Sequence, residues 1–265
     1  MDSTGIIALR EEGGNTYIVR MEDAHIKVKG IGVFNPKRSL EGMAFGDDVD
    51  IGSKTFTILP ASLPERVIGM RRRAQIIQPK DAGALIARMG IGAGSRVLEA
   101  GMGSGGLSMQ IQNVLGEHGV HVVVEARSEH AEVGLENLER GLLAGVARSH
   151  HHIEGRIEQS IDEISAICSQ FDAMILDLAD HPSAISAVSG LLGVGGRLAC
   201  YCPVTSQIES CWDACEAAGL EVEWAGELIE RTWGRASRGG IRPVNGPIGH
   251  TAFLLVALRL SGEPE

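Results

Sequence analysis

The sequence predicts an α/β fold in which helices cover both faces of a mostly parallel sheet, preceded by a small all-β domain. From residue 79 onward, apolar runs of strand length alternate with segments of helical spacing, which is typical of parallel sheets with crossover helices. Before residue 65, short β-type runs are separated by turn residues. We therefore expect two domains, residues 1–64 and residues 65–265, that meet near the linker Pro60–Pro64.

The first domain should consist of strands joined by tight turns. A glycine pair, an Asn-Pro step and a Gly-Asp-Asp step separate its apolar runs, and these residues favour turns. The expected strands cover Ile6–Leu9, Thr16–Val19, His25–Val28 and Val49–Leu59. Short strands at this spacing predict a small barrel or sandwich.

The second domain should alternate strand and helix. Its expected strands cover Arg96–Ala100, His121–Glu125, Phe171–Leu176, Gly196–Cys202, Leu220–Ile229 and His250–Leu260. Its expected helices cover Asp81–Met89, Gly105–Leu115, Glu129–Leu143, Ser183–Leu192 and Ser206–Ala218. Only a loop rich in glycine and arginine joins the last two strands, so we expect one antiparallel strand near the sheet edge. We expect the triplet His150–His152 in a solvent-exposed loop.

Composition excludes disordered and membrane-spanning classes. Hydrophobic residues make up 44% of the chain and charged residues 22%, which are ordinary values for a globular protein. The longest apolar run, Ala252–Leu258, is far shorter than the about 20 residues that a membrane span needs. The first residues carry no basic and apolar targeting pattern. We therefore expect a soluble, cytoplasmic protein that does not associate with a membrane.

The net charge of −10 does not favour a nucleic-acid partner, but the basic residues are clustered. The two basic segments are Arg66, Arg71, Arg72, Arg73 and Lys80, and then Arg231, Arg235, Arg238 and Arg242. Such local positive patches on an acidic protein can hold phosphates at chosen places. The alternative is that these arginines are simply solvated.

The chain has five cysteines and no C-x-x-C spacing. All of them lie in the last 98 or so residues, from Cys168 to Cys215, with Cys211 and Cys215 one helical turn apart. This pattern favours reduced, mostly buried thiols, so we expect no metal site. The sequence leaves open whether any of them form disulfides.

A glycine-rich turn between a strand and a helix predicts a nucleotide-type cofactor site. The segment Glu99–Gly106 formally satisfies G-x-G-x-x-G, and Glu125 follows about 20 residues later, as in dinucleotide-binding folds. Two features favour S-adenosylmethionine instead: the acid Glu99 before the first glycine, and the helix expected before the first strand. This cofactor carries an ammonium and a sulfonium, for which carboxylates are suitable partners. Glu125 can accept both of its ribose hydroxyls.

Several motifs resemble the tRNA adenine-N1 methyltransferases that act on the T loop. They are Arg73–Asp81, Val97–Gly105, Asp177-Leu178, Gly196–Leu198 with Tyr201-x-Pro203 and Gln207, and Arg242-Pro243 with Gly249–Leu254. The resemblance covers most of the chain and implies a class I S-adenosylmethionine-dependent methyltransferase with a Rossmann-like, seven-stranded sheet containing one antiparallel strand. It also implies methylation of N1 of adenosine 58 in tRNA, in archaeal-type members also of adenosine 57, and a homotetramer.

The resemblance, together with the residue chemistry, assigns roles to individual side chains. Asp177 is the expected catalytic residue. Asp180, three residues further on, is its rival and ranks second, because His181 could pair with it. The expected cofactor-binding residues are Gln75, Glu99, Gly101, Gly103, Ser104, Gly105, Gly106, Leu107, Glu125, Ala126 and Asp177. The expected tRNA-binding residues are Arg71, Arg72, Arg73, Lys80, Tyr201, Gln207, Arg242 and His250.

The sequence also departs from the family pattern. No aromatic residue follows Pro182, and Arg156 stands where the family commonly has an aspartate near adenine. Three other functions stay open at this point: a non-catalytic tRNA-binding subunit, a methyltransferase for proteins or small molecules, and, least favoured, a dehydrogenase. Binding of S-adenosylmethionine would argue against a non-catalytic subunit. Salt-dependent binding of tRNA would argue against a methyltransferase for proteins or small molecules.

Overall fold

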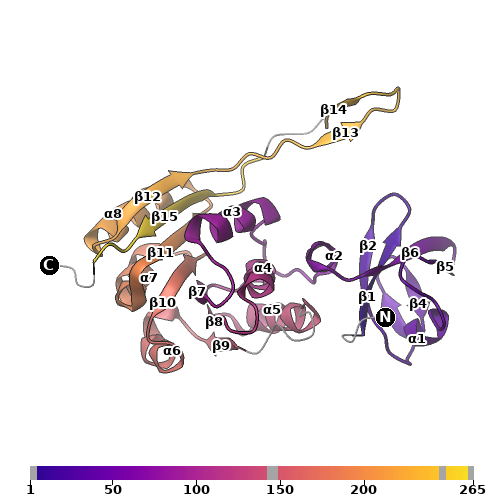
Figure 1. Cartoon of the computed structure of the whole chain (residues 1–265), viewed down its shortest axis with the longest axis horizontal. Coiled ribbons are helices and arrows are strands. Elements are labelled where there is room, and N and C mark those ends of the chain that lie inside the picture. Colours follow the sequence, from indigo (N-terminus) through magenta and orange to yellow (C-terminus); the bar gives the residue numbers. More distant parts are fainter. Residues whose placement is uncertain (1–4, 142–148, 245–248, 262–265) are drawn as a thin grey trace.

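A computed structural model of the chain describes residues 5–141, 149–244 and 249–261. Its N-terminal part is a small β domain, seen on the right of Figure 1. The strands β1 (Ile6–Glu11), β2 (Thr16–Arg20), β5 (Asp48–Ile51) and β6 (Lys54–Pro60) form an antiparallel sheet in the order β2-β1-β6-β5. The hairpin β3 (Ile26–Val28) and β4 (Gly32–Phe34) and the short helix α1 (Pro36–Ser39) close over one side of it.

The central strands β1 and β6 build the core of this small domain: burial alternates along β6, whereas Ile6–Leu9 of β1 is buried on both faces. Their inward side chains pack with side chains of β2 and of the hairpin into one apolar core that includes Ile7, Leu9, Phe56 and Ile58. The helix α2 (Leu63–Gly69) then leads to the larger domain and packs against β2. Ser62 precedes it and Pro64 lies in its first turn, where proline is compatible with a helix.

The larger domain is built on a seven-stranded sheet, and the expected antiparallel strand is confirmed. The strands are β7 (Arg96–Ala100), β8 (Val120–Glu125), β9 (His150–Glu154), β10 (Phe171–Leu176), β11 (Leu192–Cys202), β12 (Glu221–Gly226) and β15 (Phe253–Leu258). Their order is β12-β15-β11-β10-β7-β8-β9. The strand β15 runs antiparallel to both of its neighbours, whereas β9, β8, β7, β10 and β11 are parallel.

Two apolar layers lie on the two faces of this sheet. The helices α3 (Pro79–Met89), α4 (Gly106–Leu115) and α5 (Ser128–Gly141) cover one face. The helices α6 (Ile161–Ile167), α7 (His181–Val188) and α8 (Thr205–Ala217) cover the other face. Adjacent residues of β7 illustrate the alternation, since Val97 faces the first layer and Leu98 the second.

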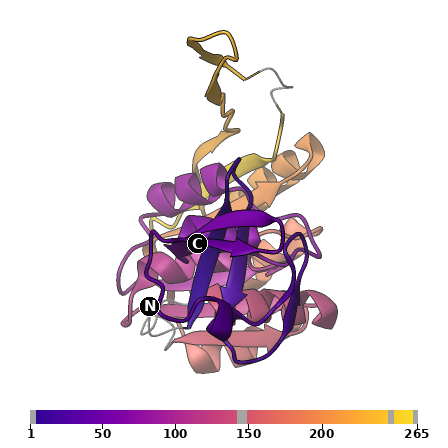
Figure 2. The ribbon, with the colours of Figure 1, turned by 90° about the vertical axis from the view of Figure 1, so that its right-hand side faces the viewer.

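The loop expected between the last two strands contains a hairpin arm. The strands β13 (Trp233–Arg235) and β14 (Ile241–Pro243) pair antiparallel, and both ribbon views show them extending away from the rest of the molecule (Figures 1 and 2). Gly239 and Gly240 adopt positive φ angles in the turn, which permits the reversal. Short strands between glycines and arginines carry little periodic signal, so the sequence predicted only a loop.

Other elements differ from expectation in detail. The triplet His150–His152 belongs to the edge strand β9 rather than to a loop, and His150 and His152 are partly buried. The helix expected over residues 129–143 is α5, and residues 142 and 143 lie outside the described part. The strand expected to start at Gly196 already begins at Leu192, after a 3-10 turn over Ser189–Leu191.

Within the described residues, none of the helices is both long enough and apolar enough to cross a bilayer. The cysteines are free thiols, and all except the half-buried Cys168 are buried.

Candidate functional site

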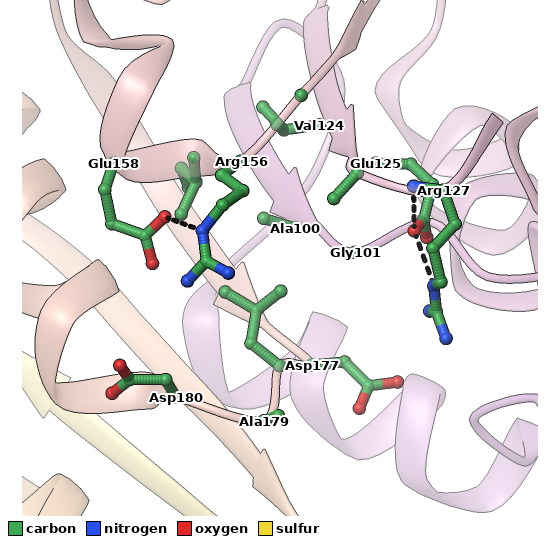
Figure 3. Close-up of a pocket in the computed structure, with 14 residues that line it drawn as sticks. Ala100, Gly101, Val124, Glu125, Arg127, Arg156, Glu158, Asp177, Ala179 and Asp180 are labelled. Atoms are coloured by element: carbon green, nitrogen blue, oxygen red, sulfur yellow. Dashed lines mark hydrogen bonds and ion pairs between the residues drawn. The ribbon is translucent and has the colours of Figure 1, made fainter.

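The parallel strands β7, β8 and β10 end side by side, and a pocket of about 400 Å³ lies at their carboxyl ends (Figure 3). Open α/β sheets bind ligands at this edge. The residues that line the pocket are Ala100, Gly101, Val124, Glu125, Ala126, Arg127, Gly155, Arg156, Ile157, Glu158, Asp177, Leu178, Ala179 and Asp180. Four of the expected cofactor-binding residues are therefore brought together here: Gly101, Glu125, Ala126 and Asp177.

The glycine-rich turn forms one wall of the pocket and depends on close backbone approaches. A Cβ atom on Gly101 would lie 3.0 Å from Glu125 Oε2, on the side where the carboxylate faces the turn. Gly105 precedes α4 with a φ of +78°, and a Cβ there would lie 3.0 Å from the carbonyl oxygen of Gly134. The remaining expected residues of the turn do not line the pocket: Gly103 is half-buried, and Ser104, Gly105, Gly106 and Leu107 are buried beneath the turn.

Glu125 ends β8 and holds the turn through its carboxylate. Glu125 Oε2 accepts a hydrogen bond of 2.9 Å from the Gly103 amide, and Oε1 accepts bonds from the amide and the Nε of Arg127. Burial alone would raise the pKa of Glu125, but the Gly103 amide and Arg127 outweigh it and lower the pKa. Glu125 is therefore an ionised acceptor that faces the pocket.

The segment Arg71–Ala74 before α3 is hydrogen-bonded to the same turn. Ser104 Oγ accepts hydrogen bonds of 3.0 Å from the Arg73 amide and 2.9 Å from the Ala74 amide. Asn137 of α5 donates from Nδ2 to the carbonyls of Arg71 and Ser104, and its Oδ1 accepts from the Arg71 amide. Asn137 was not predicted from the sequence, because a single asparagine in a polar helix gives no periodic signal.

Several arginines of this segment remain on the surface. Arg72 and Arg73 are exposed, whereas the guanidinium of Arg71 forms an ion pair with Glu136. The side chain of Gln75 is also exposed and does not line the 400 Å³ pocket. The segment therefore presents two exposed positive side chains, Arg72 and Arg73, beside the glycine-rich turn.

Asp177 follows β10 directly and lies opposite the turn. Its amide donates to the carbonyl of Ala100, and its own carbonyl accepts from the Gly101 amide at 3.3 Å, so the backbone is fixed against β7. Burial raises the pKa of the Asp177 carboxyl to about 6, with His181 acting in the opposite direction. The group is therefore ionised at neutral pH although it is largely removed from water.

Asp180, the rival candidate, has a structural partner instead. It precedes α7, and its carboxylate accepts bonds from the amide and hydroxyl of Ser183, which is the arrangement of a helix cap. The expected pairing of Asp180 with His181 is wrong, because His181 is buried and its Nε2 lies 3.3 Å from the Leu176 carbonyl oxygen. Figure 3 shows the carboxylates of Asp177 and Asp180 pointing in opposite directions.

Glu99 does not reach the pocket. Successive side chains of a strand point to opposite faces, so Ala100 lines the pocket while Glu99 points into the layer of α4. Ser108 Oγ and His121 Nε2 lie 2.9 and 3.0 Å from Glu99 Oε2. Burial raises the pKa of Glu99 to about 8, so it is uncharged at neutral pH and is unsuited to the expected contact with a cationic ligand.

One acidic residue of the pocket was missed in the sequence. Arg156 lines the pocket and pairs with Glu158 at 3.4 Å (Figure 3). Glu158 belongs to a short 3-10 turn over Ile157–Gln159, which folds it back onto the pocket. A carboxylate two residues further along the chain is thus available at this side of the site.

The expected tRNA-binding residues outside the arginine segment lie around the base of the arm. The ammonium of Lys80 donates to Asp81 Oδ1, to the Leu228 carbonyl and to Thr251 Oγ1 at 2.6–2.8 Å. These three partners use all of its hydrogens, so Lys80 is not a free cation for a phosphate. It instead links α3 to the two chain segments that lead into and out of the arm.

Most of the other expected tRNA-binding residues also have partners within the chain or are buried. His250 bonds to Glu227 Oε2 through Nδ1 at 2.8 Å and to the Pro203 carbonyl through Nε2, and Gln207 caps α8 through the Val204 amide. Tyr201 is buried, and burial raises the pKa of its phenol to about 12. Arg242 lies on β14 of the arm and is exposed.

Comparisons with known proteins agree with the geometry. A sequence profile of the family described as "tRNA methyltransferase complex GCD14 subunit" matches residues 58–239. The chain is 30% identical to the tRNA (adenine(58)-N(1))-methyltransferase TrmI of Thermus thermophilus over 96% of both chains. It is also 30% identical to the tRNA (adenine(57)-N(1)/adenine(58)-N(1))-methyltransferase TrmI of Methanocaldococcus jannaschii over 79% of this chain and 80% of that relative.

Solved structures share the fold at lower identity. A SAM-dependent O-methyltransferase of Thermotoga maritima superposes with a TM-score of 0.82 at 24% identity, covering 100% of this chain and 96% of the other. The tRNA (m1A58) methyltransferase TrmI of Aquifex aeolicus gives a TM-score of 0.74 at 19% identity, covering 98% and 99%. These likenesses confirm the predicted fold class, including the N-terminal β domain.

Proposed function

The chain belongs to the family of the tRNA methyltransferase complex GCD14 subunit, and we propose that it transfers a methyl group from S-adenosylmethionine to N1 of an adenosine in the T loop of tRNA. Nucleotide 58 is the proposed target, and nucleotide 57 is a second one, as in the name of the Methanocaldococcus relative. The observation that carries the proposal is the meeting of the glycine-rich turn, Glu125 and Asp177 at one strand edge.

The residues at this edge fit the cofactor. Glu125 offers an ionised carboxylate that accepts three hydrogen bonds, from the Gly103 amide and from the amide and Nε of Arg127, and a carboxylate has about four acceptor sites, so it can also accept from a ribose hydroxyl. The close approach of Gly101 to Glu125 leaves no room for a side chain on the turn. Leu178 and Ile157 supply apolar surface in the same pocket for a flat base. When bound, the cofactor supplies a methyl group activated by a sulfonium.

Asp177 is proposed to assist the transfer by accepting a hydrogen bond from the exocyclic amino group of adenine. Methylation at N1 makes the adenine cationic, so this amino group becomes a stronger donor as the reaction proceeds. An ionised carboxylate in a poorly hydrated site stabilises that developing charge more than it stabilises the neutral base. The backbone bonds to Ala100 and Gly101 keep Asp177 beside the glycine-rich turn.

Arg72 and Arg73 are proposed to hold phosphates of the tRNA next to the site. Both are exposed, and the Arg73 amide is fixed to Ser104 of the turn, so a phosphate bound there lies close to the pocket. An adenosine of the T loop must leave its stack to reach a pocket of this kind. Lys80 and His250 are proposed to act indirectly, by ordering the base of the arm.

The chain is further proposed to act as a homotetramer in the cytoplasm, where tRNA is found. The decisive experiment for the function uses unmodified tRNA transcripts and labelled S-adenosylmethionine, followed by mapping of the methylated nucleotide. Transcripts with guanosine at position 58 or at position 57 separate the two targets. Methylation of a transcript that has guanosine at both positions 57 and 58 would contradict the proposal, and so would label found only in protein.

A further inference from the structure

A cluster of a histidine and two thiols lies in the core, behind the loop that carries Asp177. His181 begins α7, Cys202 ends β11 and Cys211 lies on the inner face of α8. One nitrogen or sulfur atom of each residue lies within 4.8 Å of those of the other two, and all three side chains are buried. Neither the glycine-rich turn nor the tRNA-binding residues involve this cluster.

The hydrogen bonds of His181 define which of its nitrogens is available. Nε2 lies 3.3 Å from the carbonyl oxygen of Leu176, which can only accept, so Nε2 carries the hydrogen. Nδ1 then carries a lone pair; it is buried without a well-aligned hydrogen bond among the described residues, and the ring interacts with the Cys211 thiol. Metal-binding histidines show this same pattern, because the second ring nitrogen usually donates to a backbone carbonyl or a carboxylate.

The sulfur atoms are spaced for a shared ion rather than for a covalent bond. Cys202 Sγ lies 3.5 Å from Cys211 Sγ. Two thiolates on a tetrahedral zinc ion, with Zn–S distances of about 2.3 Å, lie about 3.8 Å apart, whereas a disulfide needs about 2.05 Å. Imidazole nitrogen and thiolate sulfur are the donors that zinc prefers in proteins.

We propose that His181, Cys202 and Cys211 form a binding site for Zn²⁺, with Nδ1 and the two sulfur atoms as ligands. Binding forms one Zn–N and two Zn–S bonds, and the two thiols release their protons to solvent as the hydrated ion loses water. Cys200, which is also buried, interacts with Cys211 and with Cys215. The ion would join α7, β11 and α8, and so fix the loop Asp177–Asp180 that immediately precedes His181.

The three ligands come from three separate elements, so the sequence contains no C-x-x-C spacing that would have predicted the site. Such a site needs no metal to fold, since the cluster is embedded in the apolar core between β11 and the two helices. The metal should therefore bind a preformed site and stabilise it by mass action. Binding can be tested without any assay of methyl transfer, so failure of this proposal and failure of the proposed function are distinguishable.

The test titrates the reduced full-length protein with Co²⁺ and then with Zn²⁺. Cys168→Ser is the matched control, because the Cys168 thiol lies outside the cluster and donates to the Gln170 carbonyl. Wild type and Cys168→Ser should bind one Co²⁺ with thiolate charge-transfer bands, and Zn²⁺ should displace it with an apparent Kd of about 50 nM or tighter. Cys202→Ser, Cys211→Ser and His181→Gln should lose these bands and weaken Zn²⁺ binding at least about 100-fold, as expected for a lost ligand in a three-ligand site.

Thermal unfolding gives a second readout that does not require the three ligand variants to fold. Zn²⁺ at about 100 times its Kd should raise the Tm of Cys168→Ser by roughly 5–10 °C. Absence of a charge-transfer band in folded wild type and Cys168→Ser would overturn the proposal. So would a Cys202–Cys211 disulfide found by mass spectrometry in protein purified without oxidant, or unchanged binding in Cys211→Ser.

Discussion

At the scale of single residues, the two pocket carboxylates with proposed roles, Glu125 and Asp177, have opposite electrostatic environments. Glu125 is surrounded by donors and its pKa is lowered, whereas burial raises the pKa of Asp177 to about 6. A carboxylate that nearby donors keep ionised is suited to binding the cofactor. A carboxylate in a poorly hydrated place is suited to stabilising the charge that develops during methyl transfer. This difference separates the proposed roles of the two residues more clearly than their positions in the sequence do.

Asp177→Asn should slow methyl transfer while leaving cofactor binding nearly unchanged. The lost contact strengthens only in the transition state, so we expect a single-turnover rate lower by about two to three orders of magnitude. Asp180→Asn is the matched control, because asparagine preserves a helix cap and removes only the charge. A rate loss confined to Asp180→Asn would transfer the role, and a near-normal Asp177→Asn would exclude Asp177.

The pH dependence of the same reaction supplies an independent readout. Because the pKa of Asp177 is about 6, the carboxylate is protonated below that pH and loses its charge as an acceptor. The single-turnover rate of the wild type should therefore fall as the pH decreases through about 6 and level off above it. Asp177→Asn should lose this step and keep a flat profile.

Glu125→Ala should weaken binding of S-adenosylmethionine. Loss of charge-assisted hydrogen bonds worth about 1.5–3 kcal/mol corresponds to roughly 10- to 150-fold in affinity. Calorimetric titration measures it, and Glu154→Ala is the control, because Glu154 ends the neighbouring strand in register with Glu125 but is exposed. Equal affinities in the two variants would remove Glu125 from the site.

At the scale of elements, the sequence predicted the parallel strands β7, β8, β10 and β11 and most helices, because their apolar runs are clear. It missed the parallel strand β9, which is built largely from histidine, and the arm, which is short and rich in glycine and arginine. It also placed Glu99 in the pocket, because a linear motif does not state on which face of a strand each side chain lies. Asn137 and Glu158 were found only in the structure, since their partners are distant or set by a turn.

The arginine segment before α3 should contribute to tRNA binding through two of its three side chains. Replacing Arg71, Arg72 and Arg73 with alanine should reduce the slope of log affinity against log salt by about 1.4–1.8, because each of two phosphate contacts contributes about 0.7–0.9. Arg71 should add little, since its guanidinium pairs with Glu136. Filter binding over a range of KCl concentrations measures the slope.

Arg197→Ala provides the comparison for that experiment. Arg197 pairs with Glu223 on β12, far from the strand edge that carries the pocket. Its replacement should leave the slope unchanged. A triple alanine variant with the wild-type slope would show that the arginine segment is only solvated.

At the scale of the whole molecule, the arm is the feature that the fold of one chain does not explain. A two-stranded hairpin is marginally stable on its own in water. The arm nevertheless carries large apolar side chains that are exposed, among them Ile229, Trp233, Ile241 and Val244. An exposed patch on a projecting hairpin is the kind of surface that another copy of the chain buries, which supports the proposed homotetramer.

Trp233→Ser combined with Ile241→Ser should therefore shift the protein from a tetramer toward smaller species without unfolding the sheet. Val33→Ser is the matched control: Val33 is exposed to the same extent as Trp233, 64%, but lies in the hairpin of the N-terminal domain. Sedimentation velocity gives the mass of each variant, and circular dichroism its fold. The arm also carries arginines, so a variant that keeps the tetramer mass and binds tRNA less tightly would assign the arm to RNA rather than to self-association.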